Sequence, residues 1–319
     1  MKTSFSILAL SLAFLTAPLF AGSTMETSTP DETSTSAFPF EFHAEYGYLG
    51  DSDASRGYRT QRDFNENYYL ARFIYTPRIA IGILRLGVAW ERFDFNGFDP
   101  FVGHLGGPLG PIVLFRSQLP EVLQSVSAVV GLDTRLGDSL LLRFEAQPGL
   151  YGTRNLDSDS FRIPFLLGGT YVYSPNLQFV FGASVDYDRA YPVVPGGGVR
   201  WRFAPQWVLD AVVPTPRLDF EVTKSLTLYG GADLKGGTYR VTDDRNGIAR
   251  SDARLRNALL TYSEVRAGLG IEFKVTPKIK FSAEGGYVPY RNFDYSRADV
   301  RYHQDNGGAY GAVSLNAAF

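Results

Sequence analysis

The chain ends with the segment Tyr310-Gly311-Ala312-Val313-Ser314-Leu315-Asn316-Ala317-Ala318-Phe319. Its residues alternate with period two, so the apolar residues Val313, Leu315 and Phe319 share one face of an expected strand. The small or polar residues between them, among them Ser314 and Asn316, share the other face. A strand that is apolar outward, polar inward and aromatic at its end is typical of the wall of a lipid-embedded β-barrel. Other parts of the chain agree with this interpretation.

The beginning of the chain indicates export. Lys2 gives a short positive start, the run Ile7–Phe20 is apolar, and small residues follow it. This pattern predicts a secretory signal peptide over residues 1–21, cut after Ala21 or Ser23. Residues 22–37 are rich in Ser and Thr and are expected to form a disordered leader before a barrel over 38–319. No other apolar run approaches the roughly 18 residues that a membrane helix needs.

Composition narrows the class of protein further. The sequence contains no cysteine, which excludes both a disulfide framework and the thiol of a lipoprotein anchor. The formal charge of −2, without a clustered basic face, gives no indication of nucleic-acid binding. The 24 Phe and 19 Tyr residues suit aromatic girdles at two membrane interfaces. A soluble β-sandwich could have the same composition, so composition alone indicates only a β-rich chain.

Fourteen segments with period-two alternation, separated by turn signals, are predicted to be strands. They are Phe40–Gly50, Glu66–Tyr75, Ile79–Phe93, Ser125–Arg135, Ser139–Tyr151, Ser160–Tyr173, Leu177–Asp188, Gly197–Phe203, Trp207–Val213, Arg217–Val222, Ser225–Arg240, Leu260–Val275, Lys278–Pro289 and Gly308–Phe319. If the ninth and tenth segments were one bent strand, the number would fall, and twelve is the alternative. An even number keeps both ends of the chain on one side of the membrane.

The connections are sorted by length, and this is the strongest signal in the sequence. Very short turns follow the even-numbered segments: Thr76–Arg78, Leu136–Asp138, Ser174–Asn176, Ala204–Gln206, Thr223–Lys224 and Thr276–Lys278. Long polar connections mostly follow the odd-numbered ones: Asp51–Asn65, Asn96–Gln124, Val241–Asn257 and Tyr290–Asn306. Short turns on one rim and long loops on the other predict an antiparallel up-and-down barrel in the cell outer membrane, with the short turns in the periplasm.

Charged residues on these segments are expected to face the lumen, because a charge on the lipid face costs about 2–4 kcal/mol at the bilayer midplane. The predicted pore-lining residues are Arg85, Glu91, Arg143, Glu145, Asp186, Arg200, Arg202, Asp210, Arg217, Asp219, Glu221, Asp233, Lys235, Glu264, Arg266, Glu272, Lys274, Lys280 and Glu284. Acidic and basic residues are nearly balanced, which predicts cross-strand pairing and weak selectivity. These charges could line a narrow open lumen, which we favour, or plug it. The apolar part of Asn96–Gln124 is expected to form a lid or a constriction.

No pattern of catalytic residues is found. The chain lacks a Gly-x-Ser-x-Gly motif and the His-Asp-Ser pattern of barrel phospholipases, and among its three histidines only His43 is expected to face the lumen. A hydrogen-bonded histidine is the simpler role for His43. We therefore expect no enzymatic activity, no catalytic residues, no metal site and no cofactor.

Two stretches carry a family resemblance. Leu119-Pro120-Glu121-Val122-Leu123 and Val194-Pro195-Gly196-Gly197-Gly198-Val199-Arg200-Trp201 resemble a barrel family described as a domain of unknown function. Over residues 38–319 the chain also resembles Gram-negative outer-membrane barrel proteins. That resemblance implies that Phe319 is read by the barrel-assembly machinery and that the other partner is outer-membrane lipid.

The expected function is a passive, weakly selective diffusion pore for small hydrophilic solutes. The alternative is a non-conducting barrel with a structural or adhesive role, and a lipid-modifying enzyme is disfavoured. The transported solute and the oligomeric state are left open by the sequence.

Overall fold

The computed structural model describes residues 39–56, 59–97, 101–104, 112–115, 119–189, 191–241 and 253–319. Side chains are not described for residues 59–60, 101–104 and 112–115. The predicted signal peptide and leader lie outside the described residues. Within the described part, no helix is long and apolar enough to cross a membrane.

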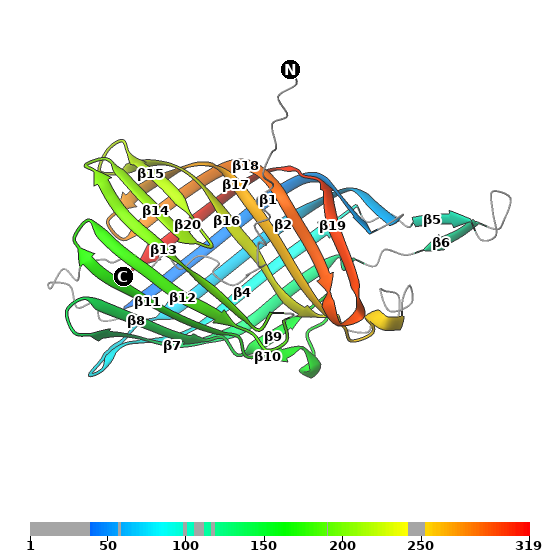
Figure 1. Ribbon diagram of the computed structural model, residues 1–319, viewed down its shortest axis with the longest axis horizontal. Coiled ribbons are helices and arrows are strands. Elements are labelled where there is room, and N and C mark those ends of the chain that lie inside the picture. Colours follow the sequence, from blue (N-terminus) through cyan, green and yellow to red (C-terminus); the bar gives the residue numbers. More distant parts are fainter. Residues whose placement is uncertain are drawn as a thin grey trace, which may run out of the picture.

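Fourteen strands form a closed antiparallel barrel (Figure 1), as predicted. In ring order they are β1 (Phe40–Arg56), β2 (Arg59–Tyr75), β4 (Gly82–Asn96), β7 (Val122–Leu136), β8 (Leu140–Ala146), β11 (Phe165–Ser174), β12 (Leu177–Val185), β13 (Val193–Ala204), β14 (Trp207–Val213), β15 (Arg217–Glu221), β16 (Leu226–Arg240), β17 (Leu259–Thr276), β18 (Ile279–Tyr295) and β20 (Ala309–Ala318). Each strand pairs with the next. We call the rim that carries the short turns the turn end and the other rim the loop end.

The last strand closes the ring against the first. β20 pairs with β1 from Glu41↔Ala318 to Leu49↔Tyr310. The backbone N–H of Phe319 donates to the carbonyl of Phe40 at 2.9 Å, and the N–H of Phe40 donates back at 3.2 Å. The two rings stack with their centroids 4.7 Å apart. The terminal aromatic residue therefore fixes the register of the closing pair at the turn end.

The strands place apolar side chains on the outside of the barrel and charged side chains on the inside, which is the reverse of the arrangement in a water-soluble protein. In β4, Leu86, Val88 and Trp90 are exposed outward, whereas the preceding residue Arg85, on the other face, is only 1 % exposed. The same alternation places Phe179 and Phe181 of β12 outside. An apolar exterior around a charged interior has its lowest free energy when lipid, and not water, surrounds the barrel.

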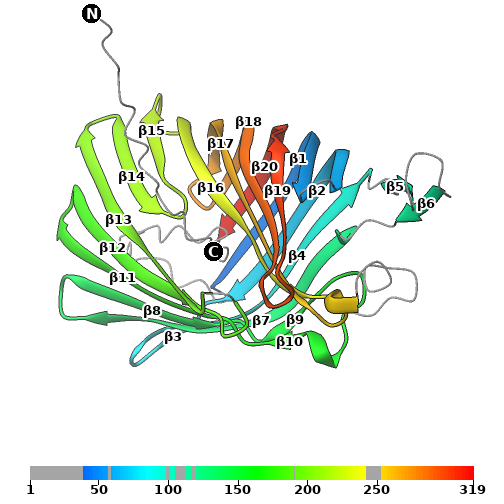
Figure 2. The same cartoon turned by 45° about the vertical axis from the view of Figure 1, so that its right-hand side comes forward.

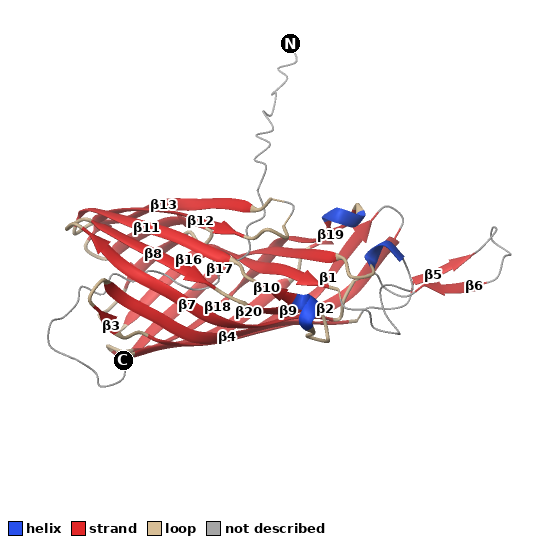
Figure 3. Ribbon diagram, turned by 90° about the horizontal axis from the view of Figure 1, so that it is seen from below, coloured by secondary structure: helices blue, strands red, loops and turns tan. Residues whose placement is uncertain are grey.

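Short strands and 3₁₀ helices lie at the loop end of the barrel. β19 (Val300–Asn306) lies between the extended ends of β18 and β1, and β9 (Gly149–Gly152) and β10 (Phe161–Arg162) pair with each other. Three single-turn 3₁₀ helices, η1 (Ser158–Ser160), η2 (Ala253–Leu255) and η3 (Ser296–Ala298), lie at the same end (Figure 3). β9 also pairs with the end of β16 through Gly152 and Arg240, so two non-adjacent parts of the wall meet there.

Several predicted boundaries were wrong, and proline explains two of them. The segment Ser139–Tyr151 is divided into β8 and β9 at Gln147-Pro148, and Ser160–Tyr173 is divided into η1, β10 and β11 at Ile163-Pro164. Proline cannot donate a ladder hydrogen bond, so it interrupts a strand inside a sheet. At the turn after β2, the two-residue strand β3 (Arg78–Ile79) folds back on β4, which begins at Gly82 and not at Ile79.

Two predicted long loops are largely strand. Asp51–Asn65 continues β1 and β2 as a hairpin, and Tyr290–Asn306 contains the end of β18, η3 and β19. These extensions do not alternate between apolar and polar residues, which is why the sequence pattern missed them. Within Asn96–Gln124, β5 (Phe101–His104) and β6 (Ile112–Phe115) form a separate two-stranded sheet that projects beyond the loop end (Figure 1). The remainder of that segment includes residues outside the described part.

Replacing Phe319 by Ala should weaken the closing pair. The variant loses a ring stack that contributes about 0.5–1.5 kcal/mol beyond its buried area, so the free energy of unfolding should fall by about that amount. Urea unfolding in lipid vesicles, followed by the gel shift between folded and unfolded barrel, measures the change. Phe319→Tyr keeps the ring and serves as the control. Equal stability of all three proteins would contradict the closing role.

Candidate functional site

The lumen contains a cavity of about 360 Å³, which we call the vestibule. It reaches the turn end, where Pro277, Lys278 and Ala318 line it, and extends inward to Lys235 and Tyr310. β1, β2, β16, β17, β18 and β20 contribute most of its lining. The alternation of each strand brings charged residues to this inner surface, so the vestibule is lined by charge.

Arg85 organises one wall of the vestibule. Its guanidinium donates two hydrogen bonds to the Glu41 carboxylate, at 3.1 and 2.9 Å, and a third to Glu145 at 3.4 Å. Glu145 also accepts a hydrogen bond from Arg72. Arg143 holds Asp133 through two bonds of 2.6 Å. Because every guanidinium in this ladder has a carboxylate partner, the wall is nearly neutral and its side chains are held in fixed positions.

Arg217 organises another wall. Its Nε donates to Asp219 at 2.5 Å, and its Nη2 lies 3.4 Å from Glu272. The guanidinium also lies over the ring of Tyr229, 4.2 Å from the ring centroid. The Tyr229 ring in turn covers Gly270, where a Cβ would lie 2.3 Å from the ring. Glycine at position 270 therefore allows the ring to lie flat along the wall and support Arg217.

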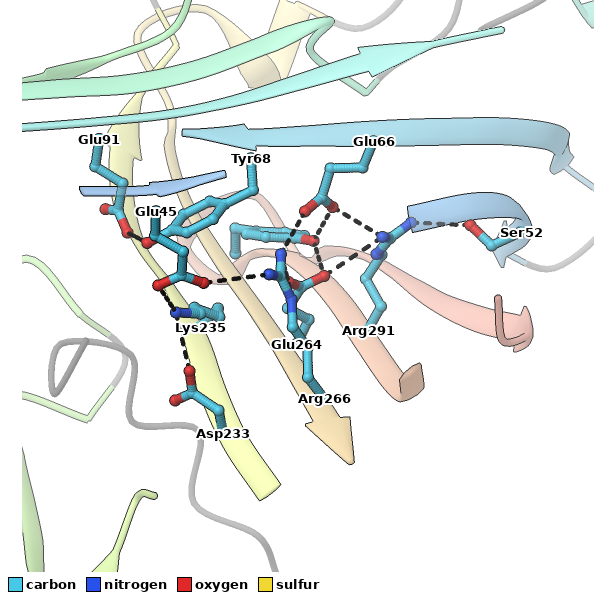
Figure 4. A network of polar contacts seen from close by, with 11 residues as sticks. Glu45, Ser52, Glu66, Tyr68, Glu91, Asp233, Lys235, Glu264, Arg266 and Arg291 are labelled. Carbon is cyan, nitrogen blue, oxygen red and sulfur yellow. Dashed lines mark hydrogen bonds and ion pairs between the residues drawn. The ribbon is translucent and has the colours of Figure 1, made fainter. Parts of the chain in front are cut away.

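A buried charge network ends the vestibule (Figure 4). At its inner end, Lys235 Nζ lies 2.9 Å from Glu45 Oε2 and 2.9 Å from Asp233 Oδ2. Lys235 is only 2 % exposed, and it lies over the ring of Tyr68. The Tyr68 hydroxyl donates to Glu91 at 3.2 Å. This part of the network joins β1, β2, β4 and β16 across the lumen.

Four fully buried charges continue the network toward the loop end. Arg266 Nη2 lies 3.1 Å from Glu66 and 2.6 Å from Glu264, and Arg291 Nη2 lies 2.8 Å from Glu66 and 3.4 Å from Glu264. The Tyr262 hydroxyl lies 2.7 Å from an oxygen of each carboxylate. Two cations thus face two anions, and these contacts offset part of the cost of removing the four charges from water.

Beyond these charges, an aromatic core occupies the loop end of the lumen. Phe93, Phe95, Tyr262 and Phe293 pack together with ring centroids 4.8–6.4 Å apart, and each is at most 2 % exposed. The core also includes Leu255 of η2 and residues of β9 and β19. The described residues therefore fill the loop end of the lumen with an apolar packing that excludes water, and the vestibule ends below it.

The predicted pore-lining residues fall into three groups. Eight line the vestibule: Arg85, Arg143, Arg217, Asp233, Lys235, Glu272, Lys280 and Glu284. Glu91, Glu264 and Arg266 lie in the buried network. All but one of the others form ion pairs on the inner face: Glu145 with Arg72 and Arg85, Asp186 with Arg162, Arg200 with Asp210, Arg202 with Glu221, and Asp219 with Arg217. Lys274 is half-buried and lies opposite Lys280 in the β17–β18 pair.

Sequence reasoning did not single out Glu66, Arg291, Arg162 or Tyr262. Glu66 shares its face of β2 with Phe64, Tyr68 and Leu70, all of them buried, and that alternation was the available signal. Arg291 was assigned to a loop because its strand continues past Pro289. His43 lines the vestibule, with Nδ1 2.6 Å from the Asn316 side-chain oxygen and Nε2 3.7 Å from Glu45.

Comparisons with solved structures return other barrels. The COG4313 outer membrane channel from Pseudomonas putida F1 is 11 % identical, with 91 % of this chain and 98 % of that chain covered and a TM-score of 0.40. The NanC porin is 12 % identical, with 87 % and 100 % covered and a TM-score of 0.39. A deltaS2 mutant of the TodX monoaromatic hydrocarbon channel is 10 % identical, with 90 % and 91 % covered and a TM-score of 0.38.

The family of the chain is shown by its sequence. Residues 134–313, more than half of the chain, match the model of the family described as Domain of unknown function (DUF6268). The chain belongs to this family. None of the curated proteins compared with the chain matches it.

Replacing Arg291 by Met should strongly destabilise the barrel. The change leaves Glu66 and Glu264 buried against one guanidinium, and breaking a buried ion cluster in this way costs about 3–5 kcal/mol. Arg301→Met is the matched control, because Arg301 forms a 2.6 Å pair with Asp294 and its side chain is 53 % exposed. The control should lose at most about 1 kcal/mol. Urea unfolding in lipid vesicles measures both; similar losses would show that the cluster does not hold the fold.

Proposed function

We propose that the protein is an outer-membrane channel for small hydrophilic solutes, closed along its axis by the buried charge network and the aromatic core. Solutes would diffuse through when these parts separate. The proposal places outer-membrane lipid against the apolar exterior, the turn end in the periplasm and the loop end outside the cell. It also assigns Phe319 to recognition by the barrel-assembly machinery, and it includes no enzymatic activity.

The charge network is the observation that carries the proposal. A lumen that serves only to hold the barrel together could be filled with apolar side chains, because replacing buried ion pairs by well-packed apolar residues is often neutral or stabilising. This lumen instead contains three buried cations, Lys235, Arg266 and Arg291, facing several carboxylates. Such groups are readily rehydrated when water enters, so a charged network supports a closure that can open.

Weak charge selectivity follows from the lining of the vestibule. Seven basic residues and five acidic residues line it, and several form ion pairs with one another or with nearby residues. Because most of these charges have a partner, neither cations nor anions should be strongly excluded. We propose no single solute.

A non-conducting structural or adhesive barrel is the second candidate. The observation in its favour is the aromatic core, which joins residues of nine strands and of the 3₁₀ helices η2 and η3 into one packed unit at the loop end. In that case the network and the core would be a permanent plug.

Planar-bilayer recording distinguishes these functions. The wild-type protein should be closed most of the time and show brief current steps. Glu66→Gln keeps the shape of the side chain but leaves two guanidinium groups facing one carboxylate, so repulsion should favour the separated network. We expect the open fraction to rise at least fivefold. Glu221→Gln, at the half-exposed pair with Arg202, is the matched control and should behave as wild type.

Each other outcome contradicts the proposal. Stable, permanently open steps in the wild type would indicate an open passive pore whose lumen is not closed by the network. The absence of current in the wild type and in Glu66→Gln, with both proteins shown to be folded by the gel shift, would favour the structural barrel.

A further inference from the structure

The barrel wall is incomplete between β13 and β16. β14 and β15, the two strands between them, have only seven and five residues, whereas β13 has twelve and β16 has fifteen. β15 pairs with β16 only from Glu221↔Thr227 to Arg217↔Gly231. Figure 2 shows the β14–β15 hairpin turning back while β13 and β16 continue on either side of it. A gap in the strand ladder therefore begins at the tip of this hairpin.

The register shows which backbone groups border the gap on β16. Ala232 N–H donates to the Pro216 carbonyl at 2.9 Å, so even-numbered residues of β16 direct their backbone groups toward β15. The next two such residues, Leu234 and Gly236, have no described strand opposite them on that side. Farther along, the Thr238 carbonyl accepts a hydrogen bond from Arg162, and Arg240 pairs with Gly152. The gap on β16 is therefore limited to Leu234 and Gly236.

β13 borders the gap with a proline. Asp186 N–H donates to the Pro192 carbonyl at 2.7 Å, so even-numbered residues of β13 face β12 and odd-numbered residues face the gap. Gly197 is the last residue of β13 that pairs with β14, opposite Val213. Pro195 comes next, and its missing N–H falls on the side that has no neighbouring strand. Proline in a sheet is found at such unpaired edges, where it removes no ladder bond.

Ion pairs close the gap on the side of the loop end. Arg162 is 5 % exposed, pairs with Asp186 and donates to Asp188 at 3.1 Å, and Arg297 of η3 lies 3.3 Å from Asp188. Burial lowers the pKa of the neighbouring Arg189 to about 10, which leaves it cationic at neutral pH. The gap is thus bounded by this ion cluster toward the loop end and by Thr215 toward the turn end. β13 and β16 form its two sides. We call it the side opening.

The side opening adjoins the vestibule on its inner side and apolar surface on its outer side. Thr215, Ala232, Asp233 and Lys235 all line the vestibule. Outside, Val193 on β13 and Val213 at the end of β14, both next to the opening, are 56 % and 53 % exposed. Lipid-facing apolar residues and a charged cavity are therefore separated here by a wall that lacks part of its strand ladder.

We propose that the side opening admits a membrane-dissolved amphiphile with an anionic head, whose apolar chain stays in the bilayer while the head enters the vestibule. Leu234 is half-buried, and its N–H has no ladder partner among the described residues, so it is available to the head on its way in. Inside, cations outnumber carboxylates seven to five along the lining, with Arg217 on β15 and Lys235 on β16 beside the opening. The inference rests on the proposed membrane location, but it does not require current along the axis.

Cysteine labelling tests the opening, because the chain has no cysteine of its own. Leu234→Cys is compared with Leu228→Cys. Leu228 lies on the same outer face of β16, but it has a paired strand on both sides, opposite Phe220 and Ile271. In phosphatidylcholine vesicles, a water-soluble anionic methanethiosulfonate should react with Leu234→Cys at least tenfold faster than with Leu228→Cys. Dodecanoate should slow the Leu234→Cys reaction at least threefold, and dodecanol should slow it less.

The possible outcomes test the side opening, the membrane location and the anionic amphiphile separately. Equally slow reaction at both positions would overturn the side opening alone. Equally fast reaction would overturn it together with the membrane location. Fast reaction at Leu234→Cys without protection by dodecanoate, or with equal protection by dodecanol, would overturn the anionic amphiphile. Val193→Cys, across the opening, is a second variant and should behave as Leu234→Cys, with Val199→Cys as its fully paired control.

Discussion

Backbone hydrogen bonding in lipid is the constraint on which the structure depends. A sheet surrounded by hydrocarbon cannot leave its edges unpaired, so the strands must close into a ring. Here β20 closes on β1, and the Phe40–Phe319 backbone bonds and ring stack fix that closure. The same constraint makes the region near β14 and β15 important, because Leu234 and Gly236 have no ladder partner on the β15 side among the described residues.

Closing fourteen strands leaves more interior space than one layer of side chains can fill. The chain fills this space differently at each depth. Near the turn end, ion-pair ladders line the vestibule. In the middle, buried charges cross from strand to strand, and at the loop end an aromatic core excludes water. The Tyr262 hydroxyl connects the last two layers, because its ring belongs to the core and its oxygen contacts Glu66 and Glu264.

The strands and the closed barrel could be predicted from the sequence, because alternation and loop length are local signals. Alternation also placed Arg85 and Glu145 on the inner surface. The closure of the lumen could not be predicted, since it depends on contacts such as Arg291 with Glu66, which are 225 residues apart. The continuation of β1, β2 and β18 beyond the alternating segments was missed for a related reason: outside lipid, one face no longer has to be apolar.

Sided labelling of the vestibule tests the central claim, that the lumen is closed between the vestibule and the loop end. Ser282 lines the vestibule, so Ser282→Cys places a thiol of similar size there. In oriented bilayers, an impermeant thiol reagent should modify this cysteine at least tenfold faster from the turn side than from the loop side, because the closed lumen opens only briefly. Modification at similar rates from both sides would contradict the account, because it would require a continuous aqueous path through the charge network and the aromatic core.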